Sequence, residues 1–155
     1  MVIDHIGIVV RSLEPAIQRW VELFGYSVSS HTVVNTRQKV RVVFLSKHGS
    51  PIVKLLEPTG TDSPVSEFSR KGGGLHHLCF RCDDMNAEID RLSGKGARLI
   101  VAPEPGEAFN NNNIAFLWVE NSLNVELIDT TEKAGWQTQS DPVSVPPFDG
   151  DATSG

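Results

Sequence analysis

Few of the features that mark secreted, membrane or nucleic-acid-binding proteins occur in this sequence. It holds two cysteines in 155 residues, and no apolar run approaches the roughly 20 residues that span a bilayer. The net charge is −5 and no basic stripe with interleaved aromatics is present, so a nucleic-acid partner is not expected. The opening residues, Val2-Ile3-Asp4-His5, show neither the basic region nor the cleavage pattern of a signal peptide. We therefore expect a cytoplasmic protein with no membrane or nucleic-acid partner.

The two cysteines, Cys79 and Cys82, form a C-x-x-C string of the kind found in redox and zinc sites. The string lies in an apolar run, 75–82, that is typical of a strand, and residues three apart in a strand point to opposite faces. No second C-x-x-C string is present in the sequence. We interpret both cysteines as ordinary reduced thiols.

Hydrophobic spacing predicts the same order of elements twice. The first half has a strand, a helix that begins after Ser12 and ends at Gly25, and three extended runs at 26–34, 39–46 and 51–57. A short helix opened by Asp62-Ser63-Pro64 and a glycine-rich connection lead to the second half. There a strand is followed by a helix that begins after Asp84 and by extended runs at 97–102, 113–119 and 124–130.

A shift of 72 residues places the second half on the first without a gap. Strand falls on strand and helix on helix, with His5 on His77, Ile17 on Ile89, Arg19 on Arg91, and Phe44-Leu45 on Phe116-Leu117. The sequence therefore predicts an α+β fold of two tandem βαβββ modules in one domain, 1–131. Its parts are module one, 1–60, a linking helix and glycine-rich connection, 61–74, and module two, 75–131.

From residue 132 onward, proline, glycine, serine and aspartate dominate the composition. Such a segment buries too little apolar surface to fold alone, so we expect a flexible C-terminal tail over 132–155. Trp136 and Phe148 are exceptions that can dock on the domain or on a partner.

The repeat also picks out a candidate site of His5, His77, Lys54 and Glu126. The two histidines are equivalent positions on the first strand of each module, and Lys54 and Glu126 are equivalent positions on the last. A charged residue in a buried strand is costly unless it is paired or bound to a metal. Two imidazoles and one carboxylate from related strands therefore suggest a metal site of His5, His77 and Glu126. We expect His31, His48 and His76 to lie outside it, with His76 facing away from His77.

A series of strings in the sequence carries a resemblance to a known family: Ile3-Asp4-His5-Ile6-Gly7-Ile8, Lys54-Leu55-Leu56-Glu57-Pro58, Gly74-Leu75-His76-His77-Leu78 and Val125-Glu126-Leu127. In order and spacing these strings resemble the vicinal oxygen chelate superfamily, which includes glyoxalases, bleomycin-resistance proteins and ring-cleaving dioxygenases. Within it, the resemblance is greatest to the methylmalonyl-CoA epimerases, and it covers about residues 2–131.

The resemblance implies a curved mixed sheet around a central cavity, a homodimer, and a divalent ion (Co, Mn, Ni, Zn or Fe) bound by His5, His77 and Glu126. In the epimerases a fourth ligand, usually Gln or Glu, stands where this chain has Lys54, whose ammonium cannot coordinate. We therefore expect weak metal binding or none. The sequence also departs from the family at Asn110–Asn113, usually glycine-rich, and at Val119-Glu120-Asn121-Ser122, usually an Asp-Pro-Asp-Gly turn.

The favoured function is an epimerase or isomerase that moves an α-proton of a carbonyl or acyl-thioester substrate, such as an acyl-CoA, through a stabilised enolate. Glu126 or Lys54 would be the catalytic base. Two alternatives stay open: a metal-free small-molecule binding or resistance protein, and an Fe(II) ring-cleaving dioxygenase, which uses two histidines and one carboxylate. For Lys54 three states remain: a neutral base beside a metal, a cation paired with Glu126, or a side chain that extends to solvent.

Overall fold

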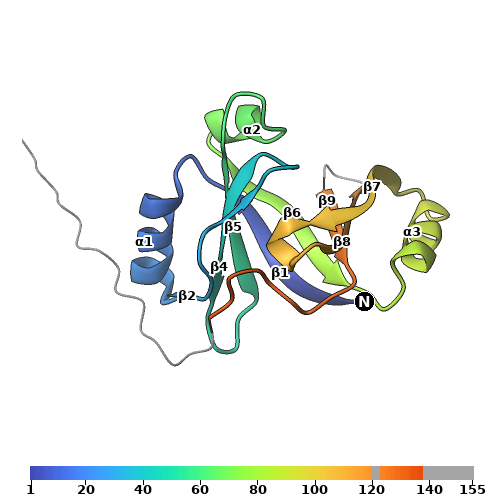
Figure 1. Cartoon of the computed structure of the whole chain (residues 1–155), viewed down its shortest axis with the longest axis horizontal. Coiled ribbons are helices and arrows are strands. Elements are labelled where there is room, and N and C mark those ends of the chain that lie inside the picture. Colours follow the sequence, from blue (N-terminus) through green and yellow to red (C-terminus); the bar gives the residue numbers. More distant parts are fainter. Residues whose placement is uncertain (120–122, 138–155) are drawn as a thin grey trace, which may run out of the picture.

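Each half of the chain folds as a βαβββ unit in the computed structural model, which describes residues 1–119 and 123–137 (Figure 1). The first half contains β1 (Val2–Val9), α1 (Leu13–Phe24), β2 (Ser27–Val28), β3 (Val33–Asn35), β4 (Val40–Ser46) and β5 (Ile52–Pro58). Helix α2 (Ser66–Arg70) links the halves. The second half contains β6 (Gly74–Arg81), α3 (Met85–Ser93), β7 (Arg98–Gly106), the 3-10 turn η1 (Glu107–Phe109), β8 (Asn112–Val119) and β9 (Leu123–Ile128).

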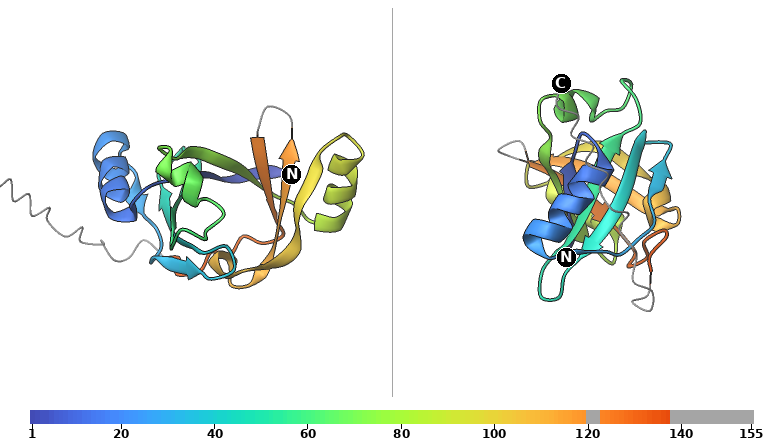
Figure 2. Two further views of the ribbon diagram at one scale, coloured as in Figure 1. Left: turned by 90° about the horizontal axis from the view of Figure 1, so that it is seen from above. Right: turned by 90° about the vertical axis from the view of Figure 1, so that its left-hand side faces the viewer.

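The strands form one nine-stranded mixed sheet in the order β2-β4-β5-β1-β6-β9-β8-β7, with β3 paired to β4 beside this path. Strand β1 is parallel to β5, β6 is parallel to β9, and an antiparallel β1–β6 pair joins the two halves. Figure 2 shows the sheet curved into a trough, with α1 and α3 outside it at opposite ends of the molecule. The predicted fold of two βαβββ modules in a curved mixed sheet is confirmed.

The 72-residue offset holds in the structure as well as in the sequence. Strands β1 and β6 begin and end at equivalent positions, and α1 and α3 begin at equivalent positions. The Asp84 carboxylate caps α3 by accepting a hydrogen bond from the Ala87 amide, as the sequence predicted. At α1 the cap comes from elsewhere, because the Leu13 amide donates to Glu57 on β5 rather than to Ser12.

Two predicted elements differ from the structure. The single extended run predicted at 26–34 is two short strands, β2 and β3, because residues between them make hydrogen bonds that do not continue the ladder with β4. The Ser30 hydroxyl accepts from the Phe44 amide, and the His31 amide donates to the Gly135 carbonyl. Helix α2 begins at Ser66 rather than at Ser63-Pro64, because the Ser63 carbonyl accepts from the Ser66 amide in a turn that precedes the helix.

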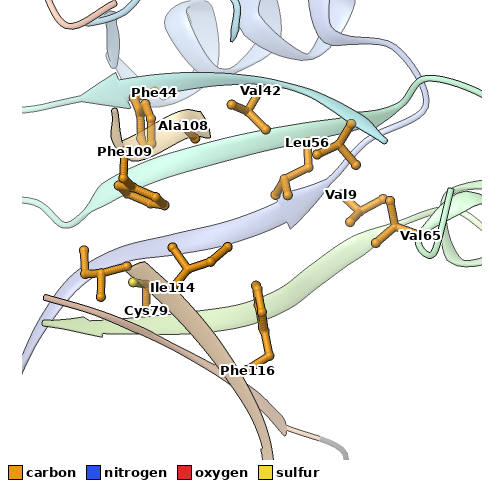
Figure 3. Close-up of a cluster of buried hydrophobic side chains, with 12 residues drawn as sticks. Val9, Val42, Phe44, Leu56, Val65, Cys79, Ala108, Phe109, Ile114 and Phe116 are labelled. Carbon is orange, nitrogen blue, oxygen red and sulfur yellow. The ribbon is translucent and has the colours of Figure 1, made fainter. Parts of the chain in front are cut away.

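The hydrophobic core is divided by the sheet into an inner cluster and two outer ones. Each outer cluster lies between one helix and the convex face of the sheet, under α1 or under α3. The inner cluster fills the concave side, where side chains from both halves point toward one another (Figure 3). Its buried members include Val9, Phe44, Leu56, Cys79, Phe109, Ile114 and Phe116.

Part of the predicted tail belongs to the folded domain. The Ala134 amide donates to the Ala108 carbonyl, and the Gln137 amide donates to the Ser29 carbonyl. Residues 120–122 and 138–155, which include Phe148, lie outside the described residues. None of the described helices combines the length and the apolar character that crossing a membrane requires. Both cysteines are free thiols and buried.

Candidate metal and catalytic site

The four residues that the repeat singled out meet at the centre of the concave face. His5 and His77 come from β1 and β6, and Lys54 and Glu126 come from β5 and β9, which flank that central pair. All four side chains are at most 1% exposed. The predicted convergence of His5, His77 and Glu126 is therefore present in the structure, and Lys54 does not extend to solvent.

The Glu126 carboxylate is the hub of this cluster. Its Oε2 lies 3.0 Å from Nε2 of His5 and 3.0 Å from Nε2 of His77, and the two imidazole nitrogens are 3.4 Å apart. Lys54 Nζ donates to both carboxylate oxygens at 3.3 and 3.4 Å. Of the three states open for Lys54, the structure contains the one in which it pairs with Glu126.

The hydrogen bond that Nδ1 of His5 makes, pointing away from Glu126, fixes which of its two nitrogens carries the proton. Its Nδ1 lies 2.9 Å from Asp4 Oδ1, and since a carboxylate only accepts, Nδ1 carries the proton. In the neutral ring, Nε2 then presents its lone pair to Glu126. Asp4 is held in turn by Lys133, whose Nζ lies 2.9 and 3.0 Å from its two oxygens. Carboxylate–histidine pairs of this kind orient metal ligands in many proteins.

The three donors His5, His77 and Glu126 are suited to one divalent ion. The separations of 3.0–3.4 Å between their donor atoms match neighbouring ligands, each roughly 2.0–2.2 Å from a shared zinc-like ion. The lone pair on Nε2 of His5 and the Glu126 oxygen that it faces also repel each other unless a cation or a proton lies between them. Lys54 cannot add a fourth bond as an ammonium, and it shares the Glu126 carboxylate that the ion would use.

Burial and charge act in opposite directions on the ionisable groups of the cluster. Burial alone would raise the pKa of Glu126, but Lys54, His77 and His5 together hold it well below its ordinary value. Burial lowers the pKa of His77 to about 3, so that ring is neutral at pH 7. For Asp4 burial also opposes ionisation, yet hydrogen bonds from His5 and Lys133 keep its pKa below the ordinary value.

Gly7 makes space for one of the histidine rings. It pairs with His77 across the β1–β6 ladder, and a β-carbon at position 7 would overlap the His77 ring. No side chain can therefore occupy this point while His77 keeps its place. Gly7, two residues after His5, thus contributes to the site because its lack of a side chain leaves room for the His77 ring.

The expectation that His76 faces away from His77 is wrong. The two Nδ1 atoms lie 2.8 Å apart, and the rings pack edge to face. Strand alternation fails here because the pairing of β1 with β6 shifts at this point, so that Gly7 pairs with His77 and Ile8 with Leu75, which leaves His76 without a partner. His76 is half-buried, and burial lowers its pKa.

Sequence reasoning also missed Asp4, Lys133 and Phe109. Asp4 sits at a second shift of the same strand pair, between Ile3 and His5. The Phe109 ring stacks on His5, with centroids 5.7 Å apart, and the Lys54 ammonium lies 4.7 Å from its centre. For Asp4 a signal existed, because it is the repeat equivalent of His76 and directly precedes His5. Lys133 lay in the expected tail and carried none.

A pocket of about 180 Å³ lies beside the cluster, on the side near α2. It contacts the cluster's immediate neighbours: Leu56 on the same face of β5 as Lys54, Phe116 whose ring edge meets His77, and His76. Its remaining walls are Gln38, Val40, Pro64, Val65, Ile100, Val101 and Asn124. None of the four cluster residues lines this pocket, so a small molecule held there would lie next to the buried cluster, separated from it by Leu56, Phe116 and His76. Elsewhere around the cluster, Phe109 stacks on His5, and a second cavity of about 570 Å³ is lined by Asp4 and Lys133 among others.

Comparisons with known proteins identify the family. The sequence pattern of the Glyoxalase/Bleomycin resistance protein/Dioxygenase superfamily matches residues 4–116. An ethylmalonyl-CoA/methylmalonyl-CoA epimerase of Cereibacter sphaeroides is 32% identical over 74% of this chain and 86% of its own length. The chain belongs to the glyoxalase/bleomycin resistance/dioxygenase superfamily.

Solved structures of methylmalonyl-CoA epimerases share the fold. That of Streptomyces coelicolor, a variant enzyme in complex with 2-nitronate-propionyl-CoA, is 30% identical and has a TM-score of 0.72, covering 83% of this chain and 96% of its own. Another epimerase, in complex with methylmalonyl-CoA and NH4+, is 30% identical with a TM-score of 0.70, covering 85% and 96%. Within the superfamily, these epimerases are therefore relatives of this chain.

Proposed function

We propose that this protein is an epimerase of acyl-CoA thioesters that removes and returns an α-proton through an enolate. The observation that carries the proposal is the convergence of His5, His77, Glu126 and Lys54 beside a pocket, on the fold of enzymes named for this reaction. The bound 2-nitronate-propionyl-CoA of one relative adds support, because a nitronate is planar and anionic like an enolate.

The reaction requires one proton to leave C2 of the acyl group and one to return on the opposite face. In the first step the C2–H electron pair moves into the thioester and its carbonyl oxygen becomes negative. Glu126 or Lys54 would be the base, and Glu126 is the better candidate, because its lowered pKa favours the carboxylate form that can accept a proton. Return of a proton to C2, from Glu126 once it is protonated or from the Lys54 ammonium, restores the thioester, so no oxidant or further reactant is needed.

His5, His77 and Glu126 are the residues that would hold a divalent ion, although Lys54 already occupies the Glu126 carboxylate that such an ion would use. When bound, such an ion would polarise the thioester carbonyl and stabilise the charge that develops on its oxygen. Asp4 would keep the Nε2 lone pair of His5 directed at the ion, and the buried, neutral His77 would be ready to bind without losing a proton. Phe109 and Leu56 keep water away from the charged groups.

The direct test is solvent exchange at C2 of methylmalonyl-CoA in D₂O, followed by mass spectrometry. We expect the protein to incorporate deuterium at C2 far faster than buffer alone, and Glu126→Gln to lose most of this rate. Glu67→Gln, which changes an exposed glutamate paired with Lys71, is the matched control and should keep it. An exchange rate equal to that of buffer would refute the proposal.

A metal-free small-molecule binding protein is the second candidate, since the Lys54–Glu126 pair already satisfies the buried carboxylate. In that case the protein would bind a CoA thioester in calorimetry and leave C2 unexchanged. The iron dioxygenase hypothesis uses the same three donors and gains no further support from the structure.

A further inference from the structure

Lys54 places an ammonium at the centre of the predicted metal site. Its side chain is 1% exposed, and among the described residues its hydrogen-bond acceptors are the two oxygens of Glu126. The face of the Phe109 ring, 4.7 Å from Nζ, provides a second favourable contact for a cation. The surroundings of Lys54 are thus those of a positive charge.

The charges of this interior are already balanced without a metal. Lys54 pairs with Glu126, and Lys133 pairs with Asp4. A divalent ion added to His5, His77 and Glu126 would leave two positive charges without a counter-charge in a region closed to water, which is strongly unfavourable. Removing the Lys54 charge would relieve half of that excess.

We propose that Lys54 is the resident cation of this site, so that its ammonium stands in place of a tightly bound metal ion. Lys54 donates to both oxygens of Glu126, and an ammonium has three N–H donors, so one donor remains for a ligand oxygen. That oxygen is the thioester carbonyl, where negative charge develops as the α-proton leaves. This last assignment rests on the proposed function, whereas the exclusion of metal does not.

A neighbouring residue connects Lys54 to the pocket. Leu56 follows Lys54 on the same face of β5 and lines the pocket directly. A thioester group that extended from the pocket past Leu56 would therefore meet Lys54. With Lys54 as the cation, Glu126 remains as the base for the α-proton.

The test compares metal affinity in the native protein and in variants without the Lys54 charge, by calorimetric titration with Co²⁺ and Zn²⁺. We expect Lys54→Gln and Lys54→Met to bind one ion per chain at least about 100-fold more tightly than the native protein, as expected for relief of like-charge repulsion. Lys54→Met separates the loss of charge from the gain of an amide ligand. Lys39→Gln removes an exposed lysine charge paired with Asp62 and should bind like the native protein. Equal affinity in the native protein and both Lys54 variants would overturn the proposal.

A measurement on the native protein keeps the proposal testable if a variant does not fold, which circular dichroism would show. Protein from cells grown with added cobalt and zinc, purified without an affinity tag, should contain far less than one metal ion per chain by elemental analysis. One tightly held ion per chain would contradict the proposal. Both measurements are independent of deuterium exchange at C2, so failure of the proposed reaction would leave the metal result standing.

Discussion

Asp4 and His76 lie 72 residues apart, and each contacts Nδ1 of the histidine that follows it, at 2.9 Å for His5 and 2.8 Å for His77. Both stand where the pairing of β1 with β6 shifts by one residue. The irregularity in the central strand pair is therefore itself repeated. Each shift allows two neighbouring side chains to approach each other, which regular strand alternation does not allow.

Replacing Asp4 by Asn should loosen His5 and destabilise the fold. An amide accepts more weakly than a carboxylate and leaves Lys133 without its counter-charge, so we expect a loss of about 1–3 kcal/mol in the free energy of unfolding. Deuterium exchange at C2 should fall by about 10- to 100-fold, the size of effect seen when the group that orients a site histidine is removed. Asp62→Asn, at an exposed aspartate also paired with a lysine, is the control for urea unfolding and for exchange. An Asp4 variant indistinguishable from that control would count against this role.

Lys133→Met should show that the segment after β9 supports the site. Methionine keeps most of the packing against Phe44 and Trp136 but removes the charge that faces Asp4. We expect stability to fall by about 1–3 kcal/mol, measured by urea unfolding, because a buried carboxylate loses one of its two partners. Lys71→Met, at an exposed lysine paired with Glu67, should leave stability nearly unchanged. Equal curves for both variants would show that the Lys133 contact adds nothing.

Gly7→Ala should displace the His77 ring. The added methyl group overlaps the ring, and overpacking of a core costs about 1–3 kcal/mol even where neighbours can adjust. Exchange at C2 should be lost with it, because His77 can no longer meet Glu126. The control is Gly60→Ala, whose β-carbon would meet only the flexible Asp62 carboxylate, at 3.1 Å. An active Gly7→Ala protein with native stability would mean that His77 is not held as described.

Filling the pocket should block substrate without touching the charged cluster. Val101→Trp places a large ring among the pocket walls, so we expect binding of a CoA thioester, measured by calorimetry, to weaken strongly while circular dichroism stays native. Val34→Trp adds the same ring at an exposed position outside the pocket and should bind normally. Unimpaired binding by Val101→Trp would place the substrate elsewhere.

A homodimer remains a prediction that rests on analogy with the family. The convex side of the central strands carries apolar side chains that face away from the cluster, and Ile3 and Leu75 on these strands are about half exposed. Such a surface is suited to a second copy of the chain. Light scattering after gel filtration should give twice the 17.0 kDa of the chain, and a monomer at high concentration would contradict this prediction.

Periodicity and the internal repeat were sufficient to predict the fold and the four central residues. Both signals depend on the spacing of buried side chains, which a regular sheet preserves from sequence to structure. His76, which was predicted to face away from His77, and Asp4, for which nothing was predicted, both lie where the strand pairing shifts and regular alternation does not hold. Lys133 escaped prediction because its contact joins residues 129 apart and has no local pattern.

Asparagines occupy positions 110–113, where the family is usually glycine-rich, and the backbone conformation explains why they are tolerated. Asn110 and Asn111 have φ values of 53° and 63°, in the left-handed region that glycine usually occupies. Asparagine tolerates this region better than most residues, because its short polar side chain can bond locally. The turn therefore needs no glycine to present Phe109 to His5.

Lys54 and Glu126 occupy equivalent positions in the two halves but carry opposite charges. The two halves of the site therefore differ electrostatically. A pocket assembled from two like halves would accept an elongated ligand in either of two orientations related by half a turn, with nearly equal energy. Lys54 Nζ lies 3.3 Å from Glu126 Oε1, so the two opposite charges form a dipole beside the pocket, and the two orientations are no longer equal. A malonyl-type ligand, negatively charged at one end only, would then enter one way round. A single difference in charge between two equivalent positions of a duplicated fold is thus sufficient to favour one orientation of a charged ligand over the other.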